Sequence, residues 1–306
     1  MKVLVATDKP FAKKAVDGIK EIIENAGHEF ALLEKYGDNA VLAQAAADAD
    51  ALIVRSDKVN ADVLKAAGKL KIVVRAGAGF DNVDLAEASA RGVVVMNTPG
   101  QNSNAVAELA VAMMIFMART QFTPATGTEI AGKTVGIQAF GNVGRLVGAK
   151  AAALGMKVLA VDPFLSAEQI VAGGAEPAAS VEELYAKSDY LSVHIPATPQ
   201  TVGSIGFELI TSMPKGATLV NTARKEVIDE AGLEKALEAR PDIKYITDVA
   251  PDNYETLKEK FGLRVFATPK KMGAQTAEAN INAGLAAARQ IVDYFATGNT
   301  RFQVNK

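Results

Sequence analysis

A glycine-rich turn between an apolar run and a helical segment is the part of this sequence best suited to chemistry. The run Thr134–Gln138 leads into Ala139-Phe140-Gly141-Asn142-Val143-Gly144, and a helical pattern follows. Unpaired N–H groups and the helix dipole favour an anion at a helix start, so this turn predicts a pyrophosphate site. Gly141 lets the backbone approach the pyrophosphate, and Gly144 lets the helix pack closely on the strand.

The acidic residue after the next apolar run indicates which dinucleotide is bound. Asp162 directly follows Lys157–Val161. A carboxylate there accepts hydrogen bonds from ribose hydroxyls and repels a 2′-phosphate, which favours NAD over NADP. Ala139 stands where this fingerprint has its first glycine, so we expect a turn whose backbone conformation suits alanine. The predicted cofactor-binding residues are Phe140, Gly141, Asn142, Val143, Gly144 and Asp162.

Two series of short apolar runs, alternating with helical patterns, must position these residues. Continuous apolar strands suit parallel sheets that are covered on both faces, and 306 residues exceed the usual size of one core. We therefore expect two doubly wound α/β domains, Rossmann-like or flavodoxin-like, with a cleft between them. The expected strands are Val3–Ala6, Ala51–Val54, Lys71–Val74, Val93–Met96, Thr134–Gln138, Lys157–Val161, Tyr190–Ile195, Ala217–Asn221, Lys244–Thr247 and Val265–Ala267.

Two features predict where one domain ends and the other begins. Asn97-Thr98-Pro99-Gly100 interrupts the pattern before a long helix, about Ser103–Ala118. The last helix, about Ala274–Phe295, is long for a crossover helix, and we expect it to return to the first domain. The expected domains are residues 1–99 with 274–306, and residues 100–273.

Composition excludes several classes of function. The formal net charge of -2 gives no bias toward nucleic acid or an anionic membrane. With no cysteine and only His28 and His194, cysteine or histidine-rich metal sites are excluded, and we expect no metal. The most apolar helix is too short to cross a membrane, so we expect a soluble, cytoplasmic protein.

Several segments together resemble the D-2-hydroxyacid dehydrogenase family. They are Val73–Asp84, Asn97–Asn102, Val193-His194-Ile195-Pro196, and Leu219–Arg224 followed by Val227-Ile228-Asp229. The matches run in order over nearly the whole chain. Within the family, Val54-Arg55-Ser56 and Arg75–Asp84 are most similar to the D-3-phosphoglycerate dehydrogenases, which open the phosphorylated route to serine.

The resemblance implies a role for each matching position. The first domain would bind substrate and the second NAD. Backbone amides of Ala76 and Gly77 would receive the substrate carboxylate, and Arg224 would hold that carboxylate and the keto oxygen. Arg55, Ser56 and Asn102 would reach a distal phosphate. Asp248 would contact the nicotinamide amide, and the remaining implied cofactor contacts are His194, Ile195, Pro196, Thr222, Ala223 and Gly273.

The sequence departs from the family where its catalytic histidine should stand. Family members carry that histidine after Thr-Pro, paired with an upstream glutamate, whereas Thr268-Pro269 is followed here by Lys270-Lys271. Counting back from Gly273-Ala274 favours Lys271, and counting from Pro269 favours Lys270. The glutamate position falls on Asn253, beside Asp252. A lysine-for-histidine variant exists among short phosphoglycerate dehydrogenases, which this segment resembles.

A lysine can carry the proton in both directions only if its neutral form is accessible. An ammonium donates the proton during reduction, and oxidation needs the neutral amine. Burial or nearby positive charge lowers a lysine pKa, and loss of a carboxylate partner acts in the same direction. The resemblance thus implies an NAD-dependent 3-phosphoglycerate dehydrogenase. Two alternatives stay open: a hydroxypyruvate or glyoxylate reductase, and a non-catalytic NAD-responsive protein resembling the family's corepressors.

The resemblance also bears on assembly and regulation. The segment Arg119–Gly127 is shorter than the dimer arm usual in the family, while the apolar helix Ala105–Met117 suits an interface. We expect a homodimer, since closed two-fold dimers are the commonest soluble oligomers. The chain ends after the closing helix, so we expect no C-terminal regulatory domain and no serine feedback of that kind.

Overall fold

A computed structural model describes residues 1–306, which separate into two compact units. Unit 1 comprises Met1–Asn102 and Gln275–Lys306, and unit 2 comprises Ser103–Ala274. The breaks lie within a few residues of those expected from the sequence. The last helix belongs to unit 1, because its apolar face packs with the first helix.

Unit 1 is built on a five-stranded parallel sheet with the order β2-β1-β3-β4-β5. This is the flavodoxin-like order, whose switch point lies between β1 and β3. Strand β3 is buried along its whole length, as a central parallel strand should be. The strands are β1 (Lys2–Thr7), β2 (Glu29–Glu34), β3 (Ala51–Val54), β4 (Ile72–Arg75) and β5 (Val94–Asn97).

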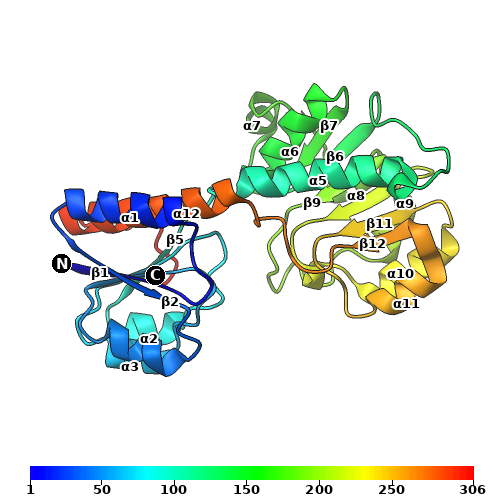
Figure 1. Cartoon of the computed structure of the whole chain (residues 1–306). Helices are drawn as coiled ribbons and strands as arrows, with labels where there is room; N and C mark the ends of the chain where they lie inside the picture. The colour runs from blue at the N-terminus through cyan, green and yellow to red at the C-terminus, as the bar shows by residue number, and fades with distance from the viewer. The chain divides into compact units, whose positions relative to one another are not determined.

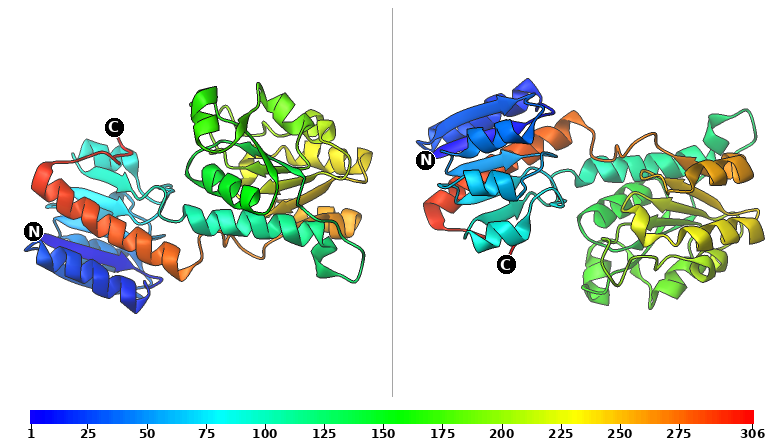
Figure 2. Two further views of the ribbon diagram at one scale, coloured as in Figure 1. Left: turned by 90° about the horizontal axis from the view of Figure 1, so that it is seen from above. Right: turned by 90° about the horizontal axis from the view of Figure 1, so that it is seen from below.

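Helices cover both faces of the unit 1 sheet (Figures 1 and 2). Helices α1 (Lys13–Asn25) and α12 (Ala277–Thr297) lie side by side on one face, where Ile19, Ile23 and Ile291 are fully buried. The other face is covered by α2 (Asn39–Ala46), α3 (Ala61–Ala66) and α4 (Leu85–Ala90). The side chain of Thr276 caps α12, and Gly298 ends it in the left-handed conformation.

Unit 2 is built on a seven-stranded parallel sheet with the order β12-β11-β10-β9-β6-β7-β8. This is the Rossmann order with one added strand, and its switch point lies between β6 and β9. Side chains from both faces form two separate buried clusters. The strands are β6 (Thr134–Gln138), β7 (Lys157–Val161), β8 (Glu176–Pro177), β9 (Tyr190–Val193), β10 (Thr218–Asn221), β11 (Lys244–Thr247) and β12 (Val265–Ala267).

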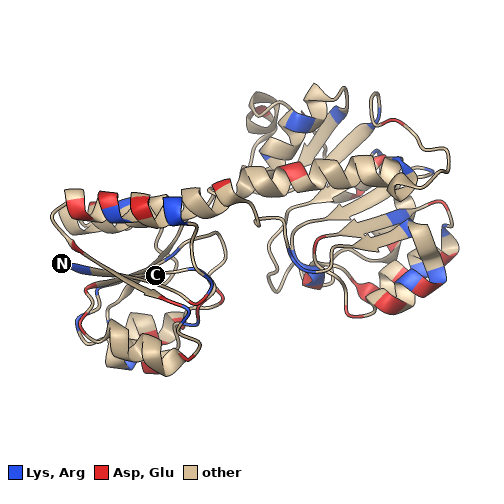
Figure 3. Cartoon of the chain, in the orientation of Figure 1, with Lys and Arg blue, Asp and Glu red and all other residues tan.

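The two faces of this sheet are covered by different helices. One cluster draws on α5 (Ser103–Ala118), α6 (Asn142–Ala153) and α7 (Ala167–Ala172). The other draws on α8 (Val181–Ala186), α9 (Phe207–Ser212), α10 (Glu230–Ala239) and α11 (Tyr254–Phe261). Helix α5 carries Glu108 as its only charged side chain, and Figure 3 shows it almost without colour. No helix of the chain is both long and apolar enough to span a bilayer.

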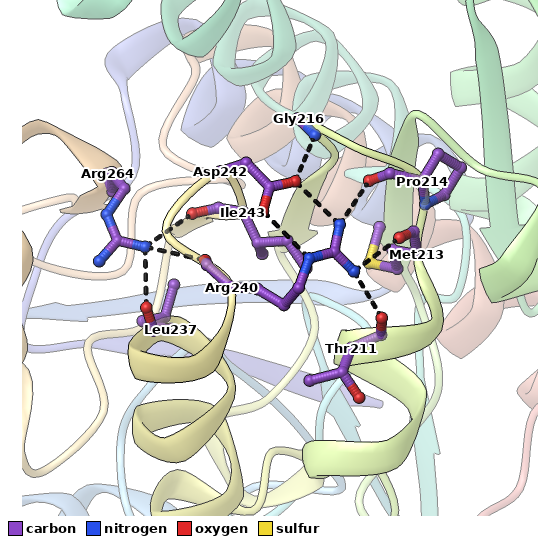
Figure 4. Close-up of polar contacts among 9 residues, drawn as sticks. All are labelled: Thr211, Met213, Pro214, Gly216, Leu237, Arg240, Asp242, Ile243 and Arg264. Atoms are coloured by element: carbon purple, nitrogen blue, oxygen red, sulfur yellow. Dashed lines mark hydrogen bonds and ion pairs between the residues drawn. The ribbon is translucent and has the colours of Figure 1, made fainter.

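A polar network holds the amino ends of β10 and β11, away from the carboxyl edge at which parallel α/β sheets bind ligands. The Arg240 guanidinium donates to both oxygens of Asp242, at 3.0 and 2.8 Å, and also to backbone carbonyls (Figure 4). Arg240 lowers the pKa of the Asp242 carboxyl well below its usual range. Arg264 donates to the carbonyls of Leu237 and Arg240. These contacts hold the loops that lead into β10 and β11, so Arg240 and Arg264 have structural roles.

The sequence missed two edge strands and misplaced some ends. Strand β2, Glu29–Glu34, was not predicted because it has no β-branched residue and is half-exposed. Strand β8 has only two residues. Strand β9 stops at Val193, two residues before the expected end, and Pro196 follows soon after. The remaining predicted strands and both domains of parallel α/β type are confirmed.

Candidate cofactor and substrate sites

The glycine-rich turn lies at the carboxyl end of β6, beside the switch point of the unit 2 sheet. Gly141 is the N-cap of α6, and a Cβ built on it meets nothing within 4 Å. A Cβ on Gly144 would lie 2.3 Å from the Ala139 carbonyl oxygen, so the helix packs too closely for any side chain there. The first N–H groups of α6 have no partner within the helix. Open space and unpaired donors fit the pyrophosphate of a dinucleotide.

The expectation for Ala139 was wrong. This residue has a φ of 75°, in the left-handed region, so the turn does not suit alanine. Its backbone is held there from both sides: its N–H donates to the Val161 carbonyl at 2.9 Å, and Gly144 packs on its carbonyl. The surrounding contacts impose a conformation that costs an alanine on the order of 1 kcal/mol.

Asp162 lies beside this turn, as the fingerprint predicts. One carboxylate oxygen accepts a hydrogen bond from the N–H of Phe140 at 2.8 Å, and the other from that of Phe164 at 2.9 Å. The side chain therefore fixes the turn itself. A carboxylate has about four lone-pair positions, so acceptor capacity remains for ribose hydroxyls.

The segments after β9 and β10 lie on the other side of the same switch point. The backbone N–H of His194 donates to the Gln138 carbonyl at 2.9 Å. The imidazole Nε2 of His194 lies 2.9 Å from the Ser192 hydroxyl. Burial lowers the pKa of His194 to about 4, so the imidazole is neutral near pH 7 and is a poor acid there. The buried Thr222 hydroxyl has no hydrogen-bond partner, which fits an edge that receives a polar ligand.

Asn221 holds the loop that carries Arg224. Its amide donates to the Arg224 carbonyl at 2.9 Å, and its oxygen accepts from the Ala223 N–H at 2.9 Å. The Arg224 guanidinium donates to the Ala223 carbonyl at 2.9 Å, and the structure shows no salt bridge for it. A half-buried guanidinium without a carboxylate partner is suited to a carboxylate ligand. Asn221 was not predicted as a site residue; the available signal in the sequence was an asparagine at the end of an apolar run.

Asp248, at the end of β11, anchors the loop that carries the two lysines. Its carboxylate is 1% exposed and accepts from the Thr268 hydroxyl at 2.9 Å, the Met272 N–H at 2.9 Å and the Gly273 N–H at 2.7 Å. The Thr268 hydroxyl oxygen also lies 2.9 Å from the Lys270 carbonyl oxygen, an alternative acceptor for its single proton. The loop is thus tied down on both sides of Lys270 and Lys271, whose side chains are exposed.

The position of the family's glutamate holds Asn253, with Asp252 beside it. Asp252 forms a salt bridge with Lys225. Asn253 is half-buried, and its side-chain oxygen has no hydrogen-bond partner.

In unit 1, Gly77 follows β4 with a φ of 146°, and a Cβ on it would lie 1.7 Å from an Arg75 nitrogen. The Ala76 N–H donates to the Val54 carbonyl at 2.8 Å, so this amide is not free for a carboxylate. That part of the expectation was wrong, because Ala76 continues the β3–β4 ladder. The Gly77 amide stays a candidate. Asn102 is half-buried at the last position of the first segment of unit 1.

Arg55 and Ser56 follow β3 at the carboxyl edge of the unit 1 sheet. Ser56 is exposed and lines an open groove with Lys58 and Asn82. The Arg55 guanidinium is half-buried and donates to Asn280 Oδ1 at 2.6 Å. The structure gives it no carboxylate partner. The side-chain hydrogen bonds of Arg55 are therefore all to neutral oxygens.

These arrangements first define a class of protein. Unit 2 has a sheet with the Rossmann strand order, a glycine-rich turn after its first strand and an acidic residue after its second. These features define a dinucleotide-binding α/β domain, whose ligand binds at the carboxyl ends of the strands beside the switch point. The family model for the NAD-binding domain of D-isomer specific 2-hydroxyacid dehydrogenases matches residues 106–270. The chain belongs to the D-isomer specific 2-hydroxyacid dehydrogenase family, as the sequence resemblance predicted, and NAD is the cofactor of this domain.

Within this family, the chain is similar to several 3-phosphoglycerate dehydrogenases. A crystal structure of NAD+-bound 3-phosphoglycerate dehydrogenase from Entamoeba histolytica superposes with a TM-score of 0.89 and 48% identity, covering 100% of this chain and 99% of that one. D-3-phosphoglycerate dehydrogenase of Mycobacterium leprae is 39% identical over 83% of this chain and 51% of its own length. That of Archaeoglobus fulgidus is 36% identical over 96% of this chain and 57% of its own length. The chain thus spans about half the length of the curated relatives it matches.

Proposed function

We propose that the chain catalyses the NAD-dependent oxidation of 3-phosphoglycerate to 3-phosphohydroxypyruvate, the entry step of serine biosynthesis. The observation that carries the choice of substrate is Arg55. It is a half-buried cation whose hydrogen-bond partners are all neutral oxygens. A half-buried charge is normally hydrogen-bonded to an opposite charge, and a phosphate group would supply that partner. The similarity to the Entamoeba histolytica enzyme supports the same substrate.

We assign substrate binding to unit 1 and cofactor binding to unit 2. Arg55, Ser56 and Asn102 would bind the phosphate, and the Gly77 amide would bind the carboxylate. In unit 2, the helix start at Gly141 to Gly144 would hold the pyrophosphate and Asp162 the ribose. The neutral His194, together with Ile195, Pro196, Thr222 and Ala223, would line the nicotinamide side. Asp248 has acceptor capacity left for the nicotinamide amide, beside Gly273.

The reaction follows from these roles. Bound NAD would supply the acceptor for the hydride that leaves C2 of the substrate. Arg224 holds the carboxylate with its planar fork and polarises the oxygen at C2. Lys271 removes the hydroxyl proton during oxidation and returns it during reduction. The anchor at Asp248 keeps Lys270 and Lys271 in a fixed loop, and we propose Lys271 as the acid–base group.

The test is NADH consumption with 3-phosphohydroxypyruvate, run beside hydroxypyruvate and glyoxylate. Fast turnover with the phosphorylated acid alone is the expected result. Turnover only with the unphosphorylated acids would make the chain a reductase of that type and remove the role of Arg55. NADH binding without turnover of any of them would favour a non-catalytic, NAD-responsive protein.

We further propose that the protein acts as a cytoplasmic homodimer. Helix α5 supports the dimer, since its half-buried outward residues are apolar and lead to Phe122, which is 69% exposed. Phe122 packs edge-on against Phe116 at 5.2 Å and continues the same surface. Light scattering is expected to give twice the chain mass, and a monomer mass would reject this assembly.

A further inference from the structure

The Arg55 guanidinium is held by neutral acceptors from two other parts of unit 1. Nη1 lies 3.3 Å from the Lys9 carbonyl and 3.4 Å from the Pro10 carbonyl, and Nη2 lies 2.6 Å from Asn280 Oδ1. The cation stacks 5.2 Å from the centre of the Phe11 ring. Asn280 belongs to the first turn of α12, 225 residues away in sequence. Nε and one hydrogen on Nη2 remain to donate to a ligand.

None of these contacts compensates the charge. Asp57 is the acidic group nearest in sequence, and its carboxylate is engaged elsewhere. It accepts from the Tyr36 hydroxyl at 2.6 Å, the Asp8 N–H at 2.6 Å and the Arg55 backbone N–H at 3.2 Å. It forms no salt bridge with the guanidinium. Burial lowers the pKa of the Arg55 guanidinium, and the nearby negative charge of Asp57 opposes this shift without reversing it.

We propose that Asn280 is a specificity-determining positioning residue, which orients Arg55 while leaving its charge free for a phosphomonoester dianion. An amide oxygen and a carboxylate oxygen have nearly the same shape and accept the same hydrogen bond, but only the carboxylate neutralises the guanidinium. Because the Asn280 side chain is neutral, the positive charge of Arg55 can still attract the phosphate. The inference deepens the proposed function and rests on it.

The test is Asn280→Asp, compared with Asn282→Asp as a matched control. Asn282 lies on the same helix, is exposed and receives the same change in charge. The readouts are the ratio of kcat/KM for 3-phosphohydroxypyruvate to that for hydroxypyruvate, the Kd of 3-phosphoglycerate by calorimetry, and the Tm of the full chain. We expect Asn280→Asp to lower the ratio about 10- to 100-fold, the effect of losing one charge-assisted hydrogen bond.

Opposite changes in affinity and stability distinguish this role from a structural one. The Tm of Asn280→Asp should equal or exceed that of Asn282→Asp, because a carboxylate pairs with Arg55 and suits the first turn of a helix. Asn280→Ala removes the group that orients Arg55 but adds no charge. It should therefore lower the ratio less than Asn280→Asp does. Parallel losses of Tm and of activity with both substrates would indicate a structural residue and overturn the proposal.

The proposed function can fail separately from this inference. If the wild-type protein does not prefer the phosphorylated acid, the substrate assignment is wrong and the role of Asn280 is wrong with it. If the wild type prefers that acid strongly and Asn280→Asp keeps the ratio of the control, the inference alone is wrong.

Discussion

Substitution of Asp248 by asparagine should loosen the loop that carries the two lysines. The carboxylate accepts three hydrogen bonds, from Thr268, Met272 and Gly273. An asparagine oxygen can replace Oδ1 and keep the bonds to Thr268 and Met272. Its NH2 group would then face the Gly273 N–H, which donates at 2.7 Å in the wild type. One buried donor would lose its acceptor and meet another donor.

The size of the effect follows from that single mismatch. Leaving a buried donor unsatisfied costs about 1–3 kcal/mol. We therefore expect the free energy of unfolding of unit 2 to fall by about 2 kcal/mol, measured by urea denaturation. Trypsin should also cleave faster after Lys270 and Lys271, because local opening of the loop becomes easier.

Asp252→Asn is the control for this prediction. Its side chain is 80% exposed and pairs with Lys225, so its loss should cost under about 1 kcal/mol. Equal stability of the two variants, together with unchanged cleavage after Lys270 and Lys271, would refute the argument that Asp248 anchors the loop.

Three further predictions concern single positions. Lys271→Ala should lower turnover by roughly 10²–10⁴ with NAD affinity little changed, and normal turnover would shift the assignment to Lys270. Ala139→Gly should raise the free energy of unfolding by about 1 kcal/mol, since glycine adopts the φ of 75° without strain; a decrease in urea midpoint would contradict this. His194 has a folded pKa of about 4, below the unfolded value near 6.5, so the wild type should lose up to about 3 kcal/mol as pH falls from 6.5 to 4. His194→Gln should flatten that dependence in urea titrations, and an equal slope in both proteins would place the proton uptake elsewhere.

The sequence by itself determined the features that depend on local pattern. Apolar runs predicted most strands of both sheets, because a buried parallel strand must be apolar on both faces. The spacing from Gly141 to Asp162 predicted the dinucleotide edge, since the turn, the helix start and the second strand end form one compact unit. The break after Pro99 and the unusually long last helix predicted a discontinuous first domain.

Tertiary structure decided what depends on contacts between distant residues. The φ of Ala139 is imposed by Val161 and Gly144, so no local preference of the residue could reveal it. The Ala76 amide is lost to the β3–β4 ladder. Asn280 reaches Arg55 across 225 residues only because α12 packs beside α1. A hydrogen-bond partner is selected by packing of whole elements, and the sequence near either residue does not encode it.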